Sequence, residues 1–446
     1  MSEAESIGAL LAGVRTARGV SQLRLAALLC AAAGVPTITR HEVSRWEREE
    51  RIPSGFWLRW LAATLDLPLA ELEAAAAVAR RRRAARARPG GPLWTAEGPA
   101  GRGVAEDLLR LAHAWLAGGL GVAGPPPWPT PAMTVHPRAP VDLDALSRRL
   151  AELRRLDDLV GGVDLGALVG REARRAIGAL VGPEPRAAGG GRDARRRLRL
   201  AAEFAQLAGW VSADAGRSGP AERAYRVGLW AAASAGDRAL AAHLLGSLSH
   251  LLAGTGHPRE ALLLAQTGYA GARRTAPAGP LALLLHRVAH AAALAGERRV
   301  GERALAAADR AADRRTTDRE PAWLYWLDDG ELSAMAGRSF AAMRRPLRAE
   351  PLLRARPGCR SPRTAALDGG WLARAYLDAG EPAQACAVAG DAVLAAIRAN
   401  SVRAATRALA PAPRLVALRG LPEARGFAEL IEAARPYLPL LRRNAA

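Results

Sequence analysis

Glycine recurs at nearly constant intervals in the second half of the chain, and this regularity restricts the fold more than any other feature. Successive glycines are separated by 40, 40, 41, 43 and 40 residues, at Gly216, Gly256, Gly296, Gly337, Gly380 and Gly420. Alanine follows four of them by five residues, at Ala221, Ala261, Ala342 and Ala385. Glycine suits the turn between two helices, and small residues suit the close approach of those helices. The spacing therefore predicts a series of helical hairpins.

The clearest unit reads Leu372-Ala373-x-x-Tyr376-x-x-x-Gly380-x-x-x-x-Ala385. This pattern resembles the tetratricopeptide repeat, whose helical hairpins stack into a solenoid. Because the usual period is about 34 residues, we expect longer loops between the hairpins here. The units at Gly337 and Gly420 are weaker, since Pro346 and the pair Pro411/Pro413 fall inside predicted helices. The alternative is a set of alanine-rich helices with unrelated glycines.

Residues 6–79 predict five short helices. Apolar residues at Ile7, Leu10, Leu11 and Val14 form one helical stripe, which ends at Gly19. The predicted starts of the later helices are Ser21, Thr39 (with Glu42 in a capping box), Pro53 and Pro68.

Several motifs in this region occur in a characteristic order. They are Arg18-Gly19-Val20-Ser21-Gln22, Leu25-Ala26, Val43-Ser44-Arg45-Trp46-Glu47-Arg48 and Arg51-Ile52-Pro53. Together they resemble the Cro and lambda-repressor-like (XRE-type) helix-turn-helix family over about residues 6–75. The resemblance implies that the second helix lies across a DNA backbone and that the third, Thr39–Arg48, enters the major groove. It therefore implies a sequence-specific transcriptional regulator whose partner is double-stranded DNA.

The third helix has two faces. Val43 and Trp46 are three residues apart and are expected to pack in the core. The opposite face is expected to reach base edges through Arg40, His41, Ser44 and Arg45. Arginine can donate two hydrogen bonds to guanine. The alternative for this face is an ordinary solvated helix surface.

Other residues are expected to contact phosphate. The resemblance implies that the Gln22 side chain contacts a DNA phosphate. The backbone N–H groups at the predicted helix starts favour the same anion, at Ser21, Thr39 and Ser54. The run Arg80, Arg81, Arg82 and Arg83 is either a phosphate-binding extension or a solvated helix end. The resemblance also implies a structural ion pair between Arg15 and Glu47.

Two features depart from the family pattern. Nine residues, Cys30 to Ile38, separate Leu29 from Thr39, so the second helix or the turn after it must be longer than usual. Glu49 occupies a position where the family commonly has glycine. A left-handed backbone there costs about 1 kcal/mol for other residues.

The sequence divides into four predicted segments. Residues 1–88 form the DNA-binding domain, and 89–140 form a linker with one helix at Val104–Leu116 and a proline-rich stretch at Gly124–Pro140. Residues 141–192 form a helical connector with helices at Asp142–Val160 and Asp164–Val181, and residues 193–446 form the repeats. The expected fold is all-α: a five-helix lambda-repressor-like domain followed by an α-solenoid.

The charge favours an anionic partner for the repeats as well. Lysine is absent, so all 63 positive side chains are arginine, and the formal net charge is +20. Residues 201–446 hold 33 arginines and 22 acidic residues, a net charge of +11. A concave solenoid groove with this charge would suit an acidic peptide, an acidic protein or a small-molecule effector. The alternative is that the repeats only dimerise the protein, and a homodimer is expected.

No pattern in the chain indicates catalysis. A phosphate-binding loop of the GxxxxGK[ST] type needs a lysine, and no GxSxG motif occurs. His243, His250 and His257 are spaced by seven and His286 and His290 by four, which we interpret as packed or surface histidines. We therefore expect no enzyme, no cofactor and no metal.

The location of the protein follows from similar evidence. No apolar stretch of about 18 residues predicts a membrane span, no signal peptide is visible, and the three cysteines favour a reducing compartment. We expect a cytoplasmic, nucleoid-associated protein. The alternative function is a repeat scaffold whose N-terminal domain binds a protein.

Overall fold

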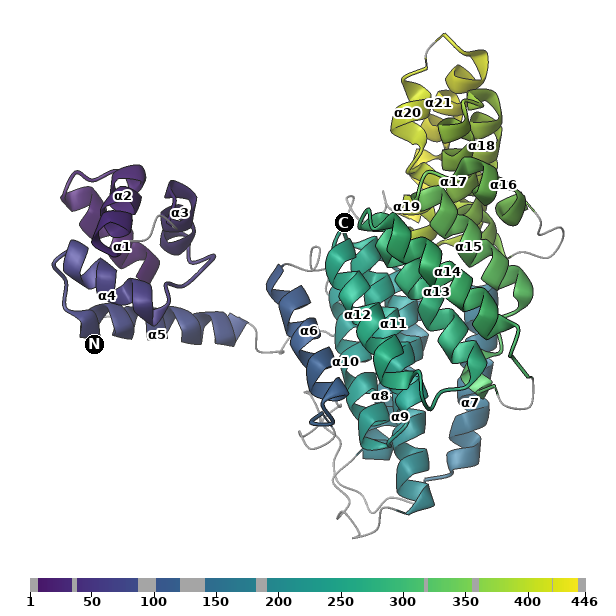
Figure 1. Cartoon of the computed structure of the whole chain (residues 1–446), viewed down its shortest axis with the longest axis horizontal. Coiled ribbons are helices and arrows are strands. Elements are labelled where there is room, and N and C mark those ends of the chain that lie inside the picture. The colour runs from purple at the N-terminus through teal and green to yellow at the C-terminus, as the bar shows by residue number, and fades with distance from the viewer. Residues whose placement is uncertain are drawn as a thin grey trace. The chain divides into compact units, whose positions relative to one another are not determined.

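The computed structural model describes residues 7–33, 38–86, 102–120, 141–181, 191–316, 320–354, 361–418 and 420–439. Side chains are not described for 80–86 and 102–106, and the predicted proline-rich stretch at Gly124–Pro140 lies outside the described residues. The described part is helical and contains no strand, which confirms the all-α prediction. None of its helices is long and apolar enough to cross a bilayer. The chain divides into two compact units, Met1–Leu93 and Trp94–Ala446 (Figure 1).

The first unit consists of α1 (Ile7–Ala17), α2 (Gln22–Ala33), α3 (Arg40–Glu47), α4 (Gly55–Thr64) and α5 (Leu69–Arg86). These helices enclose one core whose fully buried members include Leu11, Leu25 and Leu61. α1 ends where predicted, because Gly19 takes a left-handed φ of 66°. Ser21 caps α2, since its Oγ accepts a hydrogen bond from the Arg24 N–H at 3.1 Å.

Two details of this unit differ from prediction. The capping box at the start of α3 is absent: the Thr39 side chain accepts no cap hydrogen bond, and the Glu42 carboxylate binds arginines instead. α4 begins at Gly55 after Ser54, two residues later than predicted from Pro53. The long spacing after Leu29 is partly taken up by α2, which extends to Ala33.

The second unit is a solenoid of helical hairpins. It comprises α6 (Arg102–Leu116), α7 (Leu143–Leu159), α8 (Gly162–Val181), α9 (Arg192–Asp214), α10 (Ser218–Ser234), α11 (Arg238–Gly254), α12 (Pro258–Ala272), α13 (Ala278–Leu294), α14 (Arg298–Ala312), the 3-10 helix η2 (Ala322–Leu324), α15 (Asp329–Ala342), α16 (Pro346–Arg354), α17 (Pro362–Ala379), α18 (Pro382–Ala399), α19 (Val402–Leu409), α20 (Ala412–Val416), α21 (Pro422–Ala434) and the 3-10 helix η3 (Arg435–Tyr437). The hairpins are α9–α10, α11–α12, α13–α14, α15–α16 and α17–α18; all of them except α15–α16 pack more extensively than any other pair of the described helices.

The glycine spacing identified the hairpin turns in four cases and failed in two. Four of the glycines have left-handed φ values between 72° and 89° in the turns: Gly216, Gly256, Gly296 and Gly380. Gly337 instead lies buried within α15, where a Cβ would approach Leu353 Cγ to 2.9 Å. The left-handed residue of that hairpin is Arg344, with φ 61°. Gly420 lies between α20 and α21 without a left-handed φ.

The expectation of long loops between hairpins was wrong where the hairpins join directly. Residues 235–237 connect α10 to α11, and residues 273–277 connect α12 to α13. The period of about 40 residues arises because the helices themselves are long. Pro346 does not interrupt a helix but begins α16, where its missing N–H costs nothing. Pro411 and Pro413 similarly stand at the start of α20.

The segments expected to be linker and connector contribute helices to the second unit. α7 and α8 pack on α9, and their apolar residues Leu153 and Val169 belong to the same core as the hairpins. α6 packs on α12, where Gly271 leaves space for the Trp115 ring. The described helices from residue 102 onward thus form a single body.

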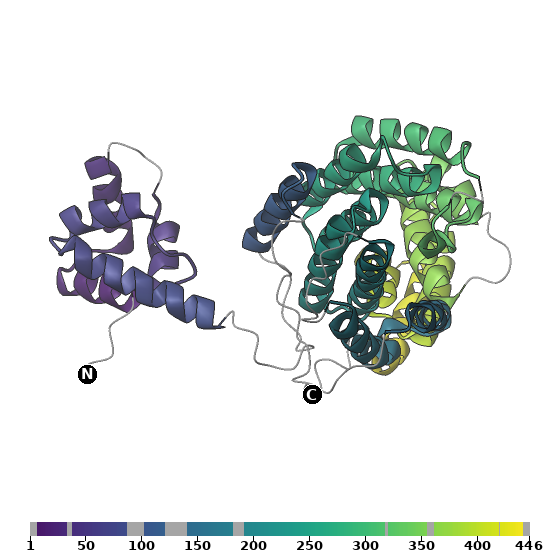
Figure 2. The same cartoon turned by 90° about the horizontal axis from the view of Figure 1, so that it is seen from below.

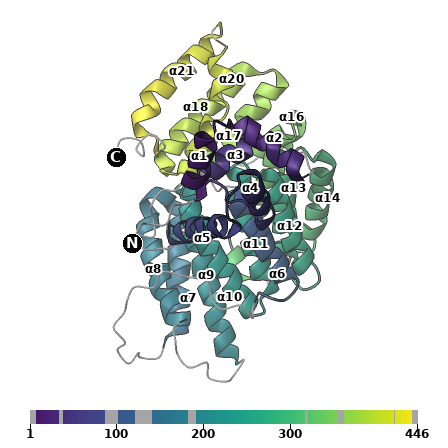
Figure 3. The ribbon, with the colours of Figure 1, turned by 90° about the vertical axis from the view of Figure 1, so that its left-hand side faces the viewer.

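The solenoid returns on itself, so that α17 to α19 lie beside α7 to α9 (Figures 2 and 3). At this closure the Asp214 carboxylate is fully buried and accepts hydrogen bonds from Ser401 Oγ at 2.8 Å and Arg403 Nε at 3.0 Å. Arg363 binds Asp157 at 2.9 Å, across 206 residues of sequence. Gly161 packs so closely against the Ala399 carbonyl that a Cβ would not fit. Buried ion pairs therefore hold the first and last hairpins together.

Candidate functional site

The two faces of α3 lie as the helical spacing predicts. Val43 and Trp46 are 0% and 2% exposed, and the Trp46 ring lies 6.2 Å from the Trp57 ring, centroid to centroid. On the other side of the helix, Arg40 and His41 are exposed and Ser44 and Arg45 are partly exposed. The four predicted base-contacting residues thus share one accessible face, while the core residues anchor the helix.

A buried carboxylate ties α3 to α1 and α2. Glu47 accepts hydrogen bonds from Arg15 Nε at 2.5 Å, Arg15 Nη2 at 3.1 Å and Gln22 Nε2 at 2.7 Å. Arg15 also donates to the Val20 carbonyl at 2.8 Å. The hydrogen bonds to Glu47 raise the pKa of Arg15 above its ordinary value. The structural ion pair between Arg15 and Glu47 is therefore present. The Gln22 amide, assigned to a phosphate by the resemblance, is bound to Glu47 in this structure.

The Arg45 guanidinium is held at the surface by a neighbouring acid. Glu42 Oε1 lies 2.7 Å from Arg45 Nη2, and Glu42 Oε2 lies 3.2 Å from Arg51 Nη1. The Arg45 side chain is 43% exposed, against 14% for Glu42. Arg45 therefore has a restrained position and an accessible edge, which lowers the entropy lost when it contacts a ligand.

The predicted phosphate contacts lie at helix starts. Ser21, Thr39 and Ser54 are exposed. Thr39 and Ser54 accept no cap hydrogen bond, so the first N–H groups of α3 and α4 keep no side-chain partner at these positions. Arg80, Arg81, Arg82 and Arg83 lie in α5, but their side chains are outside the described residues.

Glu49 adopts the left-handed conformation expected at its position, with φ 57°. Its carboxylate accepts a hydrogen bond from the Gly8 N–H at 3.1 Å, which caps the start of α1. A Cβ on Gly8 would lie 2.3 Å from the Glu47 carbonyl oxygen. The end of α3 is thus fixed against α1 by a contact that only glycine permits.

Replacement of Gly8 by alanine is expected to lower the free energy of unfolding of the first unit by about 1–3 kcal/mol, because the new methyl group must displace backbone. Gly13→Ala is the matched control: Gly13 is also in α1, nothing lies within 4 Å of its Cβ position, and alanine favours a helix. Urea unfolding of both full-length variants measures the difference. Equal stability of the two variants would contradict the close contact.

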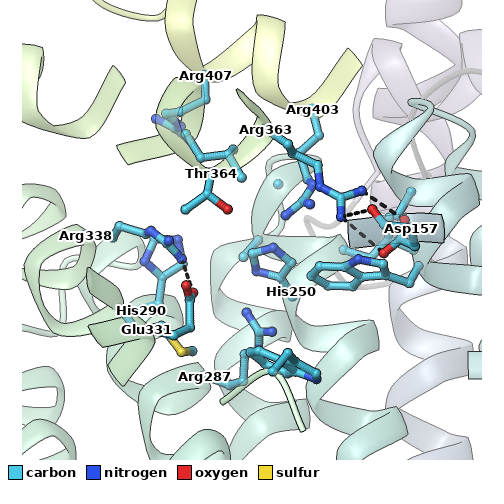
Figure 4. A pocket seen from close by; sticks show the side chains of 18 of the residues that line it. Asp157, His250, Arg287, His290, Glu331, Arg338, Arg363, Thr364, Arg403 and Arg407 are labelled. Atoms are coloured by element: carbon cyan, nitrogen blue, oxygen red, sulfur yellow. Dashed lines mark hydrogen bonds and ion pairs between the residues drawn. The ribbon is translucent and has the colours of Figure 1, made fainter. Parts of the chain in front are cut away.

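The second unit contains a cavity of about 1110 Å³ on the inner side of the solenoid. Its walls come from α7, η2 and the alternate helices α9, α11, α13, α15, α17 and α19. Figure 4 shows Arg287, His250, His290 and Arg407 around the same space, with dashed ion pairs joining Arg338 to Glu331 and Arg363 to Asp157. Aromatic rings complete the lining at Trp210, Trp323 and Trp371.

The histidines interpreted as packed or surface residues mostly line this cavity. His243 stacks on Trp323 at 4.5 Å and His250 on Trp210 at 5.8 Å, centroid to centroid. Burial, together with the charge of Arg287, lowers the pKa of His243 to about 3 and that of His286 to about 4, so both rings are neutral at pH 7. Within the described residues, no three histidines, cysteines or acidic residues are grouped to hold a metal.

Sequence reasoning assigned no role to the cavity arginines. Arg287 sits between His286 and His290 on α13, and Arg403 and Arg407 are four apart on α19. The signal available was polar residues at helical spacing within otherwise apolar helices, such as His243 and His250. Helices α13 and α19 line the same cavity only because the solenoid closes on itself.

Comparisons with protein-family models, with curated proteins and with solved structures find no match for the chain. The assignment of both sites therefore depends on the contacts described above.

Proposed function

We propose that the protein is a sequence-specific DNA-binding transcriptional regulator whose first unit binds duplex DNA and whose repeats dimerise the protein or sense a signal. The observation that carries the proposal is the orientation of α3. Its core residues Val43 and Trp46 face inward, while Arg40, His41 and Arg45 present an accessible polar face. An α-helix with such a face fits the major groove, where arginine distinguishes guanine from other bases.

The surroundings of α3 support this proposal. Glu47 joins α1, α2 and α3 through Arg15 and Gln22, so the helix is presented on a rigid support. Thr39 and Ser54 are the N-cap residues of α3 and α4, and helix starts of this kind favour phosphate. A homodimer in the cytoplasm, associated with the nucleoid, would be consistent with this function.

Selection of duplexes from a random library by the full-length protein tests the proposal. We expect enrichment of one motif, and we expect Arg45→Ala to weaken binding to that motif by about 1–3 kcal/mol while relaxing the preference at one base pair. Arg51→Ala is the matched control, because Arg51 shares the Glu42 carboxylate but lies beyond α3. If Arg45→Ala weakens binding to the motif and to random DNA equally, Arg45 contacts a phosphate and not a base. Failure of the wild type to enrich any motif would reject the function.

The second candidate is a repeat scaffold whose first unit binds a protein. It is favoured by two apolar side chains on the surface of this unit, Leu23 at 65% and Phe56 at 43% exposure. The same library experiment separates the two functions, since a scaffold would enrich no DNA motif.

A further inference from the structure

We propose that the cavity of the solenoid binds a small anionic molecule with a flat apolar body, whose carboxylate or phosphate groups pair with Arg287 and Arg407. This goes beyond DNA binding and uses other residues. The cavity volume of about 1110 Å³ lies just above the range of about 300–1,000 Å³ that is typical of small-molecule sites.

The ion pairs around the cavity leave these two arginines without an acidic partner. Arg338 binds Glu331 and Asp368, at 2.9 and 2.6 Å. The remaining paired arginines of the wall bind as follows: Arg363 to Asp157, Arg403 to Asp214, and Arg154 to Glu203. Among the described residues, no acidic side chain forms an ion pair with the Arg287 or Arg407 guanidinium.

Each of the two guanidinium groups carries an electrostatic cost in its position on the cavity wall. Burial, together with the charge of Arg403, lowers the pKa of Arg287 to about 10, although the charge of Glu331 acts in the opposite direction. Burial also lowers the pKa of Arg407 to about 10, with a smaller contribution from Arg374. Both remain charged at pH 7, and a partly buried charge without an acidic partner is unfavourable. An anion at each position would remove this cost through charge-assisted hydrogen bonds.

Unused polar atoms and aromatic rings define the rest of the ligand. The Nδ1 atoms of His250 and His286 are buried and have no hydrogen-bond partner. The Arg407 guanidinium lies over the Trp371 ring, 3.9 Å from its centroid, and this contact holds it in place. Trp210 and Trp323 also line the cavity and offer aromatic surface to a planar ligand group. In Figure 4, Arg287 and Arg407 lie on opposite sides of His290. The ligand class that satisfies these groups has a planar ring and at least one anionic group.

Thermal unfolding of the full-length protein with defined probes tests this assignment. The anionic probes are benzene-1,3-dicarboxylate and adenosine monophosphate, and their neutral counterparts are benzamide and adenosine. We expect at least one anionic probe at 10 mM to raise Tm while its neutral counterpart does not, because only binding to the folded state stabilises it. The dicarboxylate and the nucleotide distinguish a carboxylate ligand from a phosphate ligand.

The variants Arg287→Gln and Arg407→Gln identify the site. Each should weaken binding of the effective probe about tenfold or more, and Arg298→Gln, an exposed arginine of α14 outside the cavity, should not. Without a probe, Arg287→Gln should be no less stable than the wild type, since it removes an unpaired charge. A merely structural role for Arg287 predicts a lower Tm instead. Arg407→Gln also removes the contact with the Trp371 ring, so its readout is probe binding alone.

Three results would overturn the proposal: no Tm change with either anionic probe, equal effects of neutral and anionic probes, or unaltered binding by both cavity variants. Because the experiment contains no DNA, its failure leaves the proposed DNA binding intact. Conversely, failure of the protein to select any DNA motif would leave the proposed ligand site in the cavity intact.

Discussion

Replacement of Trp46 by alanine is expected to lower the free energy of unfolding of the first unit by about 3–5 kcal/mol. The Trp46 ring is 2% exposed and packs between the helices that hold α3 in place. Its removal leaves a cavity that neighbouring side chains cannot fill without moving α3. Hydrogen exchange of amides in α1 to α4 of the full-length protein measures the loss, because it reports the opening of this unit separately from the repeats.

Phe56→Ala is the control for this experiment. Phe56 is also aromatic and lies in the same unit, but it is 43% exposed. Its truncation should cost less than about 1.5 kcal/mol. If Trp46→Ala leaves exchange in α1 to α4 unchanged, the inward orientation of Trp46 is wrong, and the outward orientation of Arg45 is wrong with it.

Replacement of Asp214 by alanine is expected to destabilise the second unit by about 3–5 kcal/mol, because it breaks a buried ion pair. Asp214 is fully buried and accepts hydrogen bonds from Gly162 N at 3.0 Å and from Ser401 and Arg403. Burial alone would raise the pKa of Asp214, but the charges of Arg403 and Arg363 outweigh it and the pKa is lowered. Its stabilising contribution is therefore present at neutral pH and is lost only as the pH falls below about 4.

Asp329→Ala controls for the removal of a carboxylate. Asp329 is fully exposed and lies 3.4 Å from Arg315, so its loss should have little effect on stability. Hydrogen exchange should show that Asp214→Ala opens α7 to α9 and α17 to α19 before the hairpins between them. Uniform exchange across all hairpins would mean that the closure does not depend on Asp214.

Local periodicity in the sequence was sufficient to predict which residues of α3 are buried in the first unit. The three-residue spacing of Val43 and Trp46 determined which side of α3 is buried, and the helix-turn-helix resemblance supplied the pair Arg15 and Glu47. The three-residue spacing gave a wrong prediction at Glu42, where a capping box with Thr39 was expected. It lies three residues after Thr39 and three before Arg45, so a capping box and an ion pair were both sterically available. The guanidinium groups of Arg45 and Arg51 bind it in the folded unit.

The solenoid was predictable as a series of hairpins but not as a closed body. Gly337 has the same spacing as the turn glycines, yet α15 continues past it because Leu352 and Leu353 pack against its small surface. The cavity depends on contacts that span the whole unit, such as Arg363 with Asp157. No pattern within one repeat contains information about residues so far apart.

Photo-crosslinking from α3 tests the central claim most directly. A photoreactive amino acid is placed at His41, on the outer face of α3, or at Glu73, an exposed position of α5, in the otherwise intact full-length chain. With duplexes selected from a random library, the account predicts crosslinks from position 41 to bases of one enriched motif and few from position 73. Absence of DNA crosslinks from position 41, or equal crosslinking from both positions, would contradict it.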